Sequence, residues 1–209
     1  MTSGAESGVG IVVGVTGGVG SGKSTVAGML ARLGAELVEL DGIGHELLGD
    51  RAVRAELRRG FPEAFEGSPP DEVARRRLAE RVFADARELE RLNRVIHPRM
   101  KDEVRRRVGI FRAGAKGGVM VIEGSLVLEL GLRDLCDRLV FVDAPEDIRF
   151  ARAEAFRGWG PGEARRRENA QASLESKRGA ADAVIDGSGS RENVERQVRR
   201  LWEEIQHER

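Results

Sequence analysis

The chain has 209 residues, 40% of them hydrophobic, which is enough for one α/β domain with an inserted subdomain. Its 35 basic and 35 acidic side chains cancel, whereas proteins dedicated to nucleic acid or to a membrane surface usually carry a basic excess, so we expect neither partner. No apolar run approaches the roughly 18 residues that span a membrane.

The chain begins with small and polar residues, and we predict that residues 1–9 form a disordered tail. This segment lacks the basic and apolar regions of a signal peptide. Cys136 is the only cysteine, which excludes an intrachain disulfide and a Cys-rich zinc site and fits a reducing compartment. We therefore expect a cytoplasmic protein.

A glycine-rich segment at residues 17–25 fits the phosphate-binding pattern G-x-x-x-x-G-K-[ST]. It follows an apolar, β-branched run (11–15) and precedes a helical run (26–33), which is the context that such a loop requires. Its backbone N–H groups and the helix N-terminus would bind the phosphates of ATP, Lys23 would reach the β- and γ-phosphates, and the Ser24 hydroxyl would bind Mg²⁺. The residues expected at the nucleotide are Gly18, Val19, Gly20, Ser21, Gly22, Lys23, Ser24 and Thr25. The alternative is a glycine-rich turn that binds nothing.

Residues 36–41 are predicted as the second strand, parallel to the first because a helix lies between them. Asp41 would stand at the carboxyl end of this strand, the edge at which open parallel sheets bind their ligands. At that place it would either meet the group that receives the phosphate or cap the following helix.

Residues 45–112 are strongly charged, and no segment among them alternates as a strand does. We predict a helical insert with three helical runs, at 73–83, 88–96 and 100–111. His97 lies between the last two and is a candidate for a structural or a catalytic role.

Residues 119–122 are fully apolar, as a central parallel strand should be, and they are followed by Glu123. In a chain that already has a phosphate loop, an acid at this place is the Walker B arrangement, in which the carboxylate holds Mg²⁺. The alternative role for Glu123 is capping of a helix.

Residues 138–143 are predicted as the fourth strand. A helix with Arg149, Arg152 and Arg157 follows, then a break at 158–162 and a second helix at 163–177. This pair would either close over the nucleotide as a lid, with arginines on the transferred phosphoryl group, or form a solvated charged hairpin. Residues 183–186 are the fifth predicted strand, and 192–206 form a closing helix whose apolar face contains Val194, Val198, Leu201 and Ile205.

The order and spacing of these segments resemble the dephospho-coenzyme A kinase family, P-loop kinases related to the nucleoside monophosphate kinases. The resemblance runs from about residue 11 to residue 205, and its most specific part is the segment 13–25. The shorter matches are Leu33-Gly34, Arg75, Leu78, Val82-Phe83, Leu92-Asn93, His97-Pro98, Gln171, Lys177-Arg178, Ala181-Asp182 and Val184-Ile185-Asp186.

The chain departs from the family pattern on the acceptor and adenine sides. Glu39-Leu40-Asp41 stands where the family usually has Asp-Ala-Asp, so only Asp41 keeps the acid that would activate the acceptor hydroxyl. The other departures are His45 for an Arg, Glu123 for an Asp, Ser125 where the segment 125–129 normally starts with Pro, Gly187 for an Asn, and a spacing of Arg152 and Arg157 that is one residue longer.

The resemblance implies an α/β chain with the three-layer P-loop NTPase fold, which has a five-stranded parallel sheet, a helical acceptor-binding insert and a helical lid. The core would comprise residues 10–44, 113–150 and 181–209, the insert 45–112 and the lid 151–180. The implied reaction is ATP-dependent phosphorylation of the ribose 3′-hydroxyl of dephospho-coenzyme A, the last step of coenzyme A biosynthesis, by a monomer or small homo-oligomer.

The family also implies roles for individual residues. The catalytic residues would be Lys23, Asp41, Arg152 and Arg157, the acceptor-binding residues Asp41, Arg75 and His97, and the Mg²⁺ ligands Ser24 and Glu123. Two other functions remain open: a kinase of the same fold with a nucleoside or nucleotide acceptor, and a non-catalytic regulatory protein that binds ATP.

Overall fold

A computed structural model describes residues 10–67, 71–114 and 117–207, so the predicted tail at 1–9 lies outside the described part of the chain. The chain forms two compact units: residues 40–103 make up the second, and the remaining described residues make up the first. Within the described residues, no helix is both long and apolar enough to cross a membrane.

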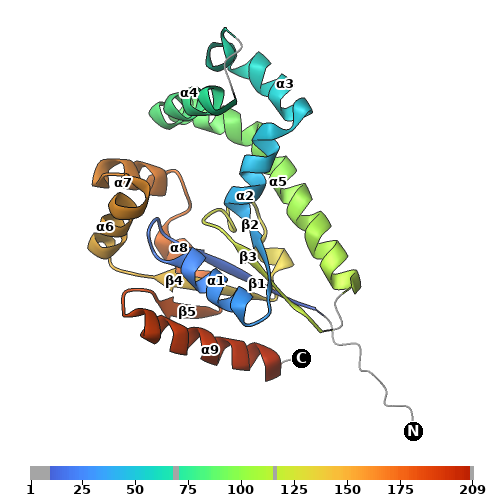
Figure 1. The fold of residues 1–209 in the computed structure, drawn as a ribbon, viewed down its shortest axis with the longest axis vertical. Helices are drawn as coiled ribbons and strands as arrows, with labels where there is room; N and C mark the ends of the chain where they lie inside the picture. The colour runs from blue at the N-terminus through green and yellow to red at the C-terminus, as the bar shows by residue number, and fades with distance from the viewer. Residues whose placement is uncertain (1–9, 68–70, 115–116, 208–209) are drawn as a thin grey trace. The chain divides into compact units, whose positions relative to one another are not determined.

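The first unit is built on a five-stranded parallel sheet in the order β2-β3-β1-β4-β5 (Figure 1). The strands are β1 (Ile11–Gly17), β2 (Glu36–Glu39), β3 (Val119–Glu123), β4 (Arg138–Asp143) and β5 (Ala183–Asp186). The three central strands are buried along nearly their whole length, because helices cover both faces of a parallel sheet. The predicted five-stranded parallel sheet is confirmed.

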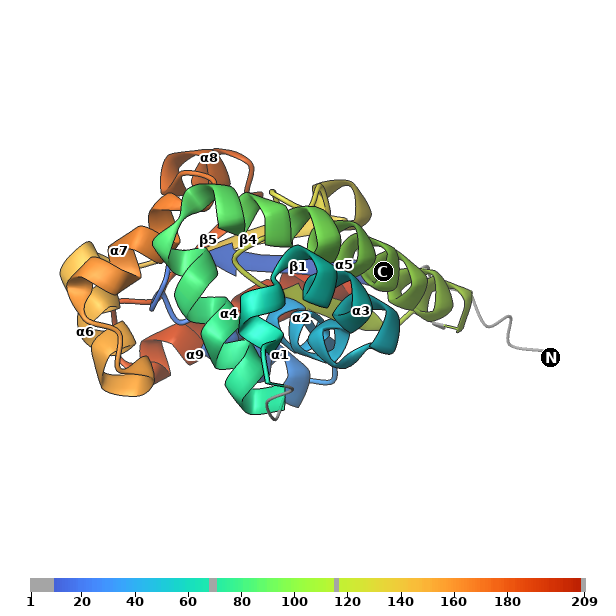
Figure 2. The ribbon, with the colours of Figure 1, turned by 90° about the horizontal axis from the view of Figure 1, so that it is seen from above.

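Two helices cover one face of this sheet, α1 (Lys23–Arg32) and α9 (Arg191–His207), and α8 (Leu174–Gly179) lies on the opposite side (Figure 2). The predicted apolar face of α9, formed by Val194, Val198, Leu201 and Ile205, is buried. It joins one core cluster with Val26 and Leu30 of α1 and with residues of β1, β3, β4 and β5. This core holds the start of α1, and therefore the glycine loop before it, against the end of β1.

The second predicted strand is two residues too long. We predicted it to run to Asp41, but β2 ends at Glu39 and the helix α2 (Leu40–Gly49) begins at the next residue. Leu40 is 1% exposed, which fits a buried helical position as well as a buried strand position. Asp41 consequently lies in the first turn of a helix, where the positive end of the helix dipole stabilises a carboxylate.

The second unit is helical, as the pattern predicted. After α2 it contains α3 (Arg51–Gly60), a 3₁₀ turn (Pro62–Phe65), α4 (Asp71–Ala84) and the first part of α5 (Ala86–Gly114). The Asp50 carboxylate caps α3 by accepting from the backbone N–H groups of Ala52 and Val53, at 2.8 and 2.9 Å. Val53, Leu57 and Phe61, each 1% exposed, contribute to the core of this unit.

One expected break is missing and one unexpected break is present. The helical runs predicted at 88–96 and 100–111 are a single helix, α5, which continues through Pro98. In the turn that the proline disturbs, the Arg99 guanidinium donates to the Val95 carbonyl at 2.6 Å.

The helix predicted at 163–177 is two helices, α7 (Pro161–Asn169) and α8. Between them the Ala172 N–H donates to Glu129 Oε1 at 2.7 Å, and Ser173 caps α8.

Candidate functional site

The glycine loop turns sharply between β1 and α1. Gly20 and Gly22 have φ values of +72° and +97°, a region that L side chains rarely adopt, so the loop needs glycine at both positions. The first turn of α1 contains no acidic residue. The positive end of the helix dipole is therefore open to a bound anion.

A cavity of about 450 Å³ lies at this helix terminus. Its lining combines the glycine loop and α1 with α6 (Glu146–Arg157), the turn after β5 and the start of α9. The lining residues are Gly20, Gly22, Lys23, Ser24, Thr25, Val26, Arg152, Ala153, Phe156, Arg157, Gly187, Gly189, Arg191 and Val194. Five of the eight phosphate-loop residues predicted from the sequence thus share one cavity with both predicted lid arginines.

Ser24 and Glu123 meet beside the cavity. The Ser24 hydroxyl donates to Glu123 Oε1 at 3.1 Å, and Glu123 is 4% exposed at the end of β3. A hydroxyl and a carboxylate oxygen are a donor set that suits Mg²⁺, which takes few protein ligands and keeps waters and substrate phosphates in its other positions. Accordingly, the described residues contain no group of three or more His, Cys, Asp or Glu side chains that would enclose a metal ion.

The helix α6 is tied to the turn after β5 across the cavity. Arg152 Nη1 donates to the Gly187 carbonyl at 2.8 Å. A Cβ at Gly187 would lie 2.4 Å from the Ser21 carbonyl oxygen, so the absence of a side chain lets this turn approach the glycine loop. Further along α6, the exposed Arg157 stacks on Trp159, with its guanidinium carbon 4.9 Å from the ring centre.

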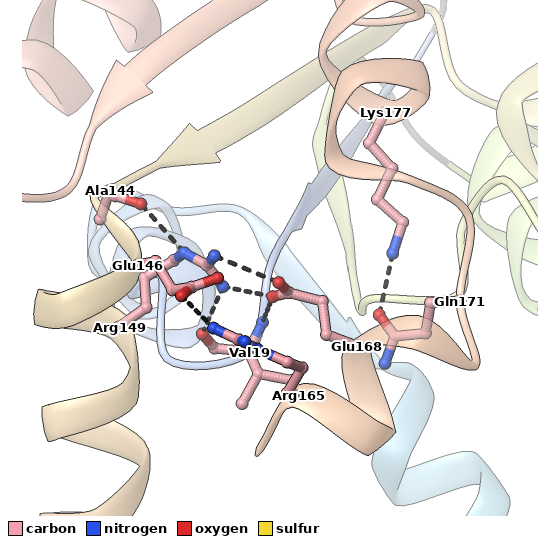
Figure 3. Close-up of polar contacts among 8 residues, drawn as sticks. All are labelled: Val19, Ala144, Glu146, Arg149, Arg165, Glu168, Gln171 and Lys177. Atoms are coloured by element: carbon pink, nitrogen blue, oxygen red, sulfur yellow. Dashed lines mark hydrogen bonds and ion pairs between the residues drawn. The ribbon is translucent and has the colours of Figure 1, made fainter. Parts of the chain in front are cut away.

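Three predicted nucleotide residues do not line the cavity. Val19 contacts the buried Arg149 and the half-buried Glu168 on the outer side of the loop (Figure 3). The Gly18 backbone lies close to the same two side chains. Ser21 is fully buried. These residues shape the loop from behind rather than forming its inner surface.

A buried lysine lies near this outer side. Lys177 is fully buried, and its Nζ donates to Gln171 Oε1 at 2.9 Å and pairs with Glu129 Oε1 at 3.2 Å. Burial lowers the pKa of Lys177, and the charge of Glu129 opposes that shift. The lysine fixes the segment between α7 and α8 to the chain that follows β3.

The predicted acceptor residues Asp41, Arg75 and His97 belong to the second unit. Arg75 Nη1 donates to His45 Nε2 at 2.7 Å, so Arg75 contacts one of the residues that depart from the family pattern. Asp41 is exposed in the first turn of α2, and His97 lies in α5 next to Pro98. Their contact with an acceptor stays a prediction.

The sequence did not indicate that Phe156, Gly189, Arg191 and Val194 line the cavity. A signal was present, because Gly187-Ser188-Gly189 follows the fifth parallel strand and must emerge at the same edge of the sheet as the glycine loop. Phe156 is 84% exposed, and nothing in its local sequence distinguishes it from an ordinary helix residue.

Comparisons with known proteins agree with this geometry. The family model for dephospho-CoA kinase matches residues 11–193. Dephospho-CoA kinase from Thermobifida fusca is 38% identical over 196 residues, which cover 93% of this chain and 96% of that protein.

Solved structures agree as well. The crystal structure of a Thermus thermophilus protein matches with a TM-score of 0.76 and 32% identity over 94% of this chain and 98% of that one. Dephospho-CoA kinase from Campylobacter jejuni shares the fold, with a TM-score of 0.64 and 21% identity over 94% and 97% of the two chains. The chain belongs to the dephospho-CoA kinase family.

Proposed function

We propose that the chain transfers the γ-phosphoryl group of ATP to the ribose 3′-hydroxyl of dephospho-coenzyme A and that the cavity at the glycine loop holds the nucleotide. The observation that carries this proposal is the contact of Ser24 with Glu123 at 3.1 Å on the border of a cavity that Lys23, Arg152 and Arg157 also line. A helix N-terminus, a lysine and two arginines in one cavity match the charge of a triphosphate.

The loop and Lys23 would fix the phosphate chain. Phosphoryl transfer passes through a loose transition state, so positioning and charge stabilisation supply most of the catalysis. The Lys23 ammonium would neutralise the charge that develops between the β- and γ-phosphates. Arg152 and Arg157 would add positive charge from α6, and the hydrogen bond of Arg152 to Gly187 would keep that side chain directed into the cavity.

Ser24 and Glu123 would hold Mg²⁺ together with the phosphates. The bound ion supplies charge neutralisation for the triphosphate. Glu123 is suited to this role because β3 is a central strand whose position is fixed by pairing with both β1 and β2.

Asp41 would orient the acceptor hydroxyl and accept its proton. Asp41 follows β2 by two residues, and the helical unit that begins there would bind the acceptor, with contacts from Arg75 and His97. The hydrogen bond between Arg75 and His45 would then fix the arginine on the acceptor side.

A coupled assay of ADP release tests this function. The protein with ATP and Mg²⁺ should release ADP quickly only when dephospho-coenzyme A is present, and the product should be coenzyme A. Adenosine and AMP in place of dephospho-coenzyme A test a kinase of the same fold with another acceptor. Equal or faster turnover with either would overturn the proposed acceptor, and binding of ATP without turnover in any mixture would favour a regulatory protein.

A further inference from the structure

A buried ion pair lies behind the glycine loop and is not part of the cavity. Arg149 of α6 and Glu168 of α7 pair through both oxygens of the carboxylate, with Nη1 at Oε2 and Nη2 at Oε1 (Figure 3). Their side chains are 4% and 14% exposed. A two-pronged pair of this kind fixes geometry more tightly than a single ion contact.

The pair holds one loop residue through both of its backbone groups. Arg149 Nη1 donates to the Val19 carbonyl at 3.2 Å, and the Val19 N–H donates to Glu168 Oε2 at 3.3 Å. Arg149 is itself anchored, because its Nε donates to the Ala144 carbonyl after β4 at 3.0 Å. The loop is thereby connected to the end of β4 and to α7.

The loop backbone lies so close to the pair that Gly18 and Gly20 have no room for a side chain. A Cβ at Gly18 would lie 2.6 Å from Arg149 Nη1 and 2.8 Å from Glu168 Oε2, and a Cβ at Gly20 would lie 2.0 Å from the Arg149 carbonyl oxygen. The Val19 side chain is 7% exposed and packs with Phe150, Ala153 and Ala164 of α6 and α7. The loop backbone and the Val19 side chain therefore both contact α6 and α7.

We propose that Arg149 and Glu168 are positioning residues for nucleotide binding: the pair holds Val19 and so fixes the curvature with which Gly20, Gly22 and Lys23 face the phosphates. Gly20, the residue after Val19, is the first residue of the loop that lines the cavity. A displacement of Val19 would therefore also displace the part of the cavity lining that Gly20 forms. The inference rests on the proposed function only in taking the cavity to be the nucleotide site.

The test needs a variant that removes the pair without leaving an unpaired charge. A single substitution would leave one buried ion without its partner, and a lone Arg149 would itself attract phosphates. The double variant Arg149→Gln, Glu168→Gln replaces both charges with neutral amides, keeps the charge balance, and preserves the size of the Glu168 side chain. Its matched control is Glu146→Gln, Arg165→Gln, which removes an exposed ion pair between the same two helices (Figure 3) and leaves both hydrogen bonds of Val19 in place.

Calorimetric titration with ADP and Mg²⁺, without any acceptor, is the primary measurement. We expect the double variant to melt cooperatively and to bind ADP about tenfold more weakly, since small misplacements of binding groups carry losses of this size or larger. In the kinase assay KM for ATP should rise and KM for dephospho-coenzyme A should stay constant. The control variant should bind ADP as the wild type does.

Two results would overturn the inference. One is wild-type ADP affinity in a double variant that has lost thermal stability, which would make the pair merely structural. The second result concerns a further variant, which is needed if the double variant does not melt cooperatively. Glu168→Asp keeps the charge and shortens the reach of the carboxylate to Val19 by one methylene. Wild-type ADP affinity in Glu168→Asp would contradict the proposal. Because the titration contains no acceptor, its outcome is independent of whether dephospho-coenzyme A proves to be the substrate.

Discussion

Ser24 and Glu123 are 99 positions apart in the sequence and share a hydrogen bond in the structure. The parallel pairing of β1 with β3 places Glu123 beside Val15, two residues before the end of β1. The contact therefore depends on the pairing of the strands. A substitution that keeps the size of Glu123 and removes its charge should weaken the proposed binding of Mg²⁺ and leave the fold intact.

We expect Glu123→Gln to raise the Mg²⁺ concentration for half-maximal activity by about tenfold or more, because an amide oxygen is a weaker ligand than a carboxylate oxygen while it can still accept from Ser24. A Mg²⁺ titration of ADP release measures this, and high Mg²⁺ should restore part of the rate. The control is Glu36→Gln, an exposed glutamate on β2. An unchanged Mg²⁺ dependence would rule out Glu123 as a ligand.

Asp41→Asn should lower kcat by roughly 10²–10⁴, the usual contribution of a general base, with little effect on ADP affinity. Glu39→Gln, an exposed acid two residues earlier, serves as the control and should retain activity. The assay is ADP release at saturating ATP and dephospho-coenzyme A. If Asp41→Asn keeps its kcat within about tenfold of the wild type, Asp41 is not the base.

The sequence was informative for those site residues that lie in a local pattern. Lys23 and Ser24 follow from the loop pattern, and Glu123 follows from the end of an apolar strand. Arg149 and Glu168 could not be paired in advance, because 19 positions and a helix break separate them and the sequence contains many other arginines and glutamates. Only the packing of α6 against α7 selects these two.

Among the elements, the N-terminal ends of β4 and β5 are joined by one side chain. Asp182, just before β5, accepts from the Leu139 N–H of β4 at 2.6 Å and from Arg133 at 3.0 Å. This carboxylate fixes where the two strands begin to pair.

We expect Asp182→Ala to lower the free energy of unfolding by about 2 kcal/mol, since hydrogen bonds to a charged group are worth roughly 1.5–3 kcal/mol. Urea unfolding measures the loss. Asp134→Ala, an exposed acid next to Arg133, is the control and should cost less than about 0.5 kcal/mol. ADP affinity should stay constant in both variants, because Asp182 lies at the strand ends opposite to the cavity; equal stability of the two variants would contradict the prediction.

Strands were predicted more accurately than breaks between helices. An apolar, β-branched run of four to seven residues is rarely anything but a strand, so all five strands were placed within two residues of their observed ends. The break between α7 and α8 depends on Glu129, which binds the Ala172 N–H from a distant part of the chain. The continuity of α5 through Pro98 likewise depends on its surroundings and is invisible to local propensity.

For the molecule as a whole, the reactivity of the Cys136 thiol is a measure of how often the first unit unfolds. Cys136 is 6% exposed, and burial raises the pKa of its thiol from 9.0 to about 12. The native protein therefore holds the protonated thiol at pH 8.5, whereas an unfolded chain has an appreciable fraction of the reactive thiolate. The same shift predicts that the free energy of unfolding falls as the pH rises from 9 towards 12, because the unfolded state loses its proton first.

We expect iodoacetamide at pH 8.5 to modify Cys136 slowly in the native protein and rapidly in denaturant, as mass spectrometry would show. ADP with Mg²⁺ at about 100 times its Kd should slow the native reaction by about 100-fold, because a ligand that binds only the folded state stabilises it by about 2.7 kcal/mol. AMP at a concentration too low to occupy the site is the control. Fast labelling of the native protein, unaffected by ADP, would show that the thiol is not buried as described.

The position of β1 in the middle of the sheet has a consequence for how the protein is made. Its neighbours come late: Ile11 pairs with Val119 of β3, and Val13 with Arg138 of β4. A ribosome therefore releases the glycine loop and its strand long before the strands that will hold them exist, and the nascent chain carries an apolar strand with both edges unpaired. Premature termination before residue 138 leaves at least one edge of that strand unpaired. Truncated products should therefore be aggregation-prone and depend on chaperones, while the cavity at the glycine loop forms only near the completion of synthesis.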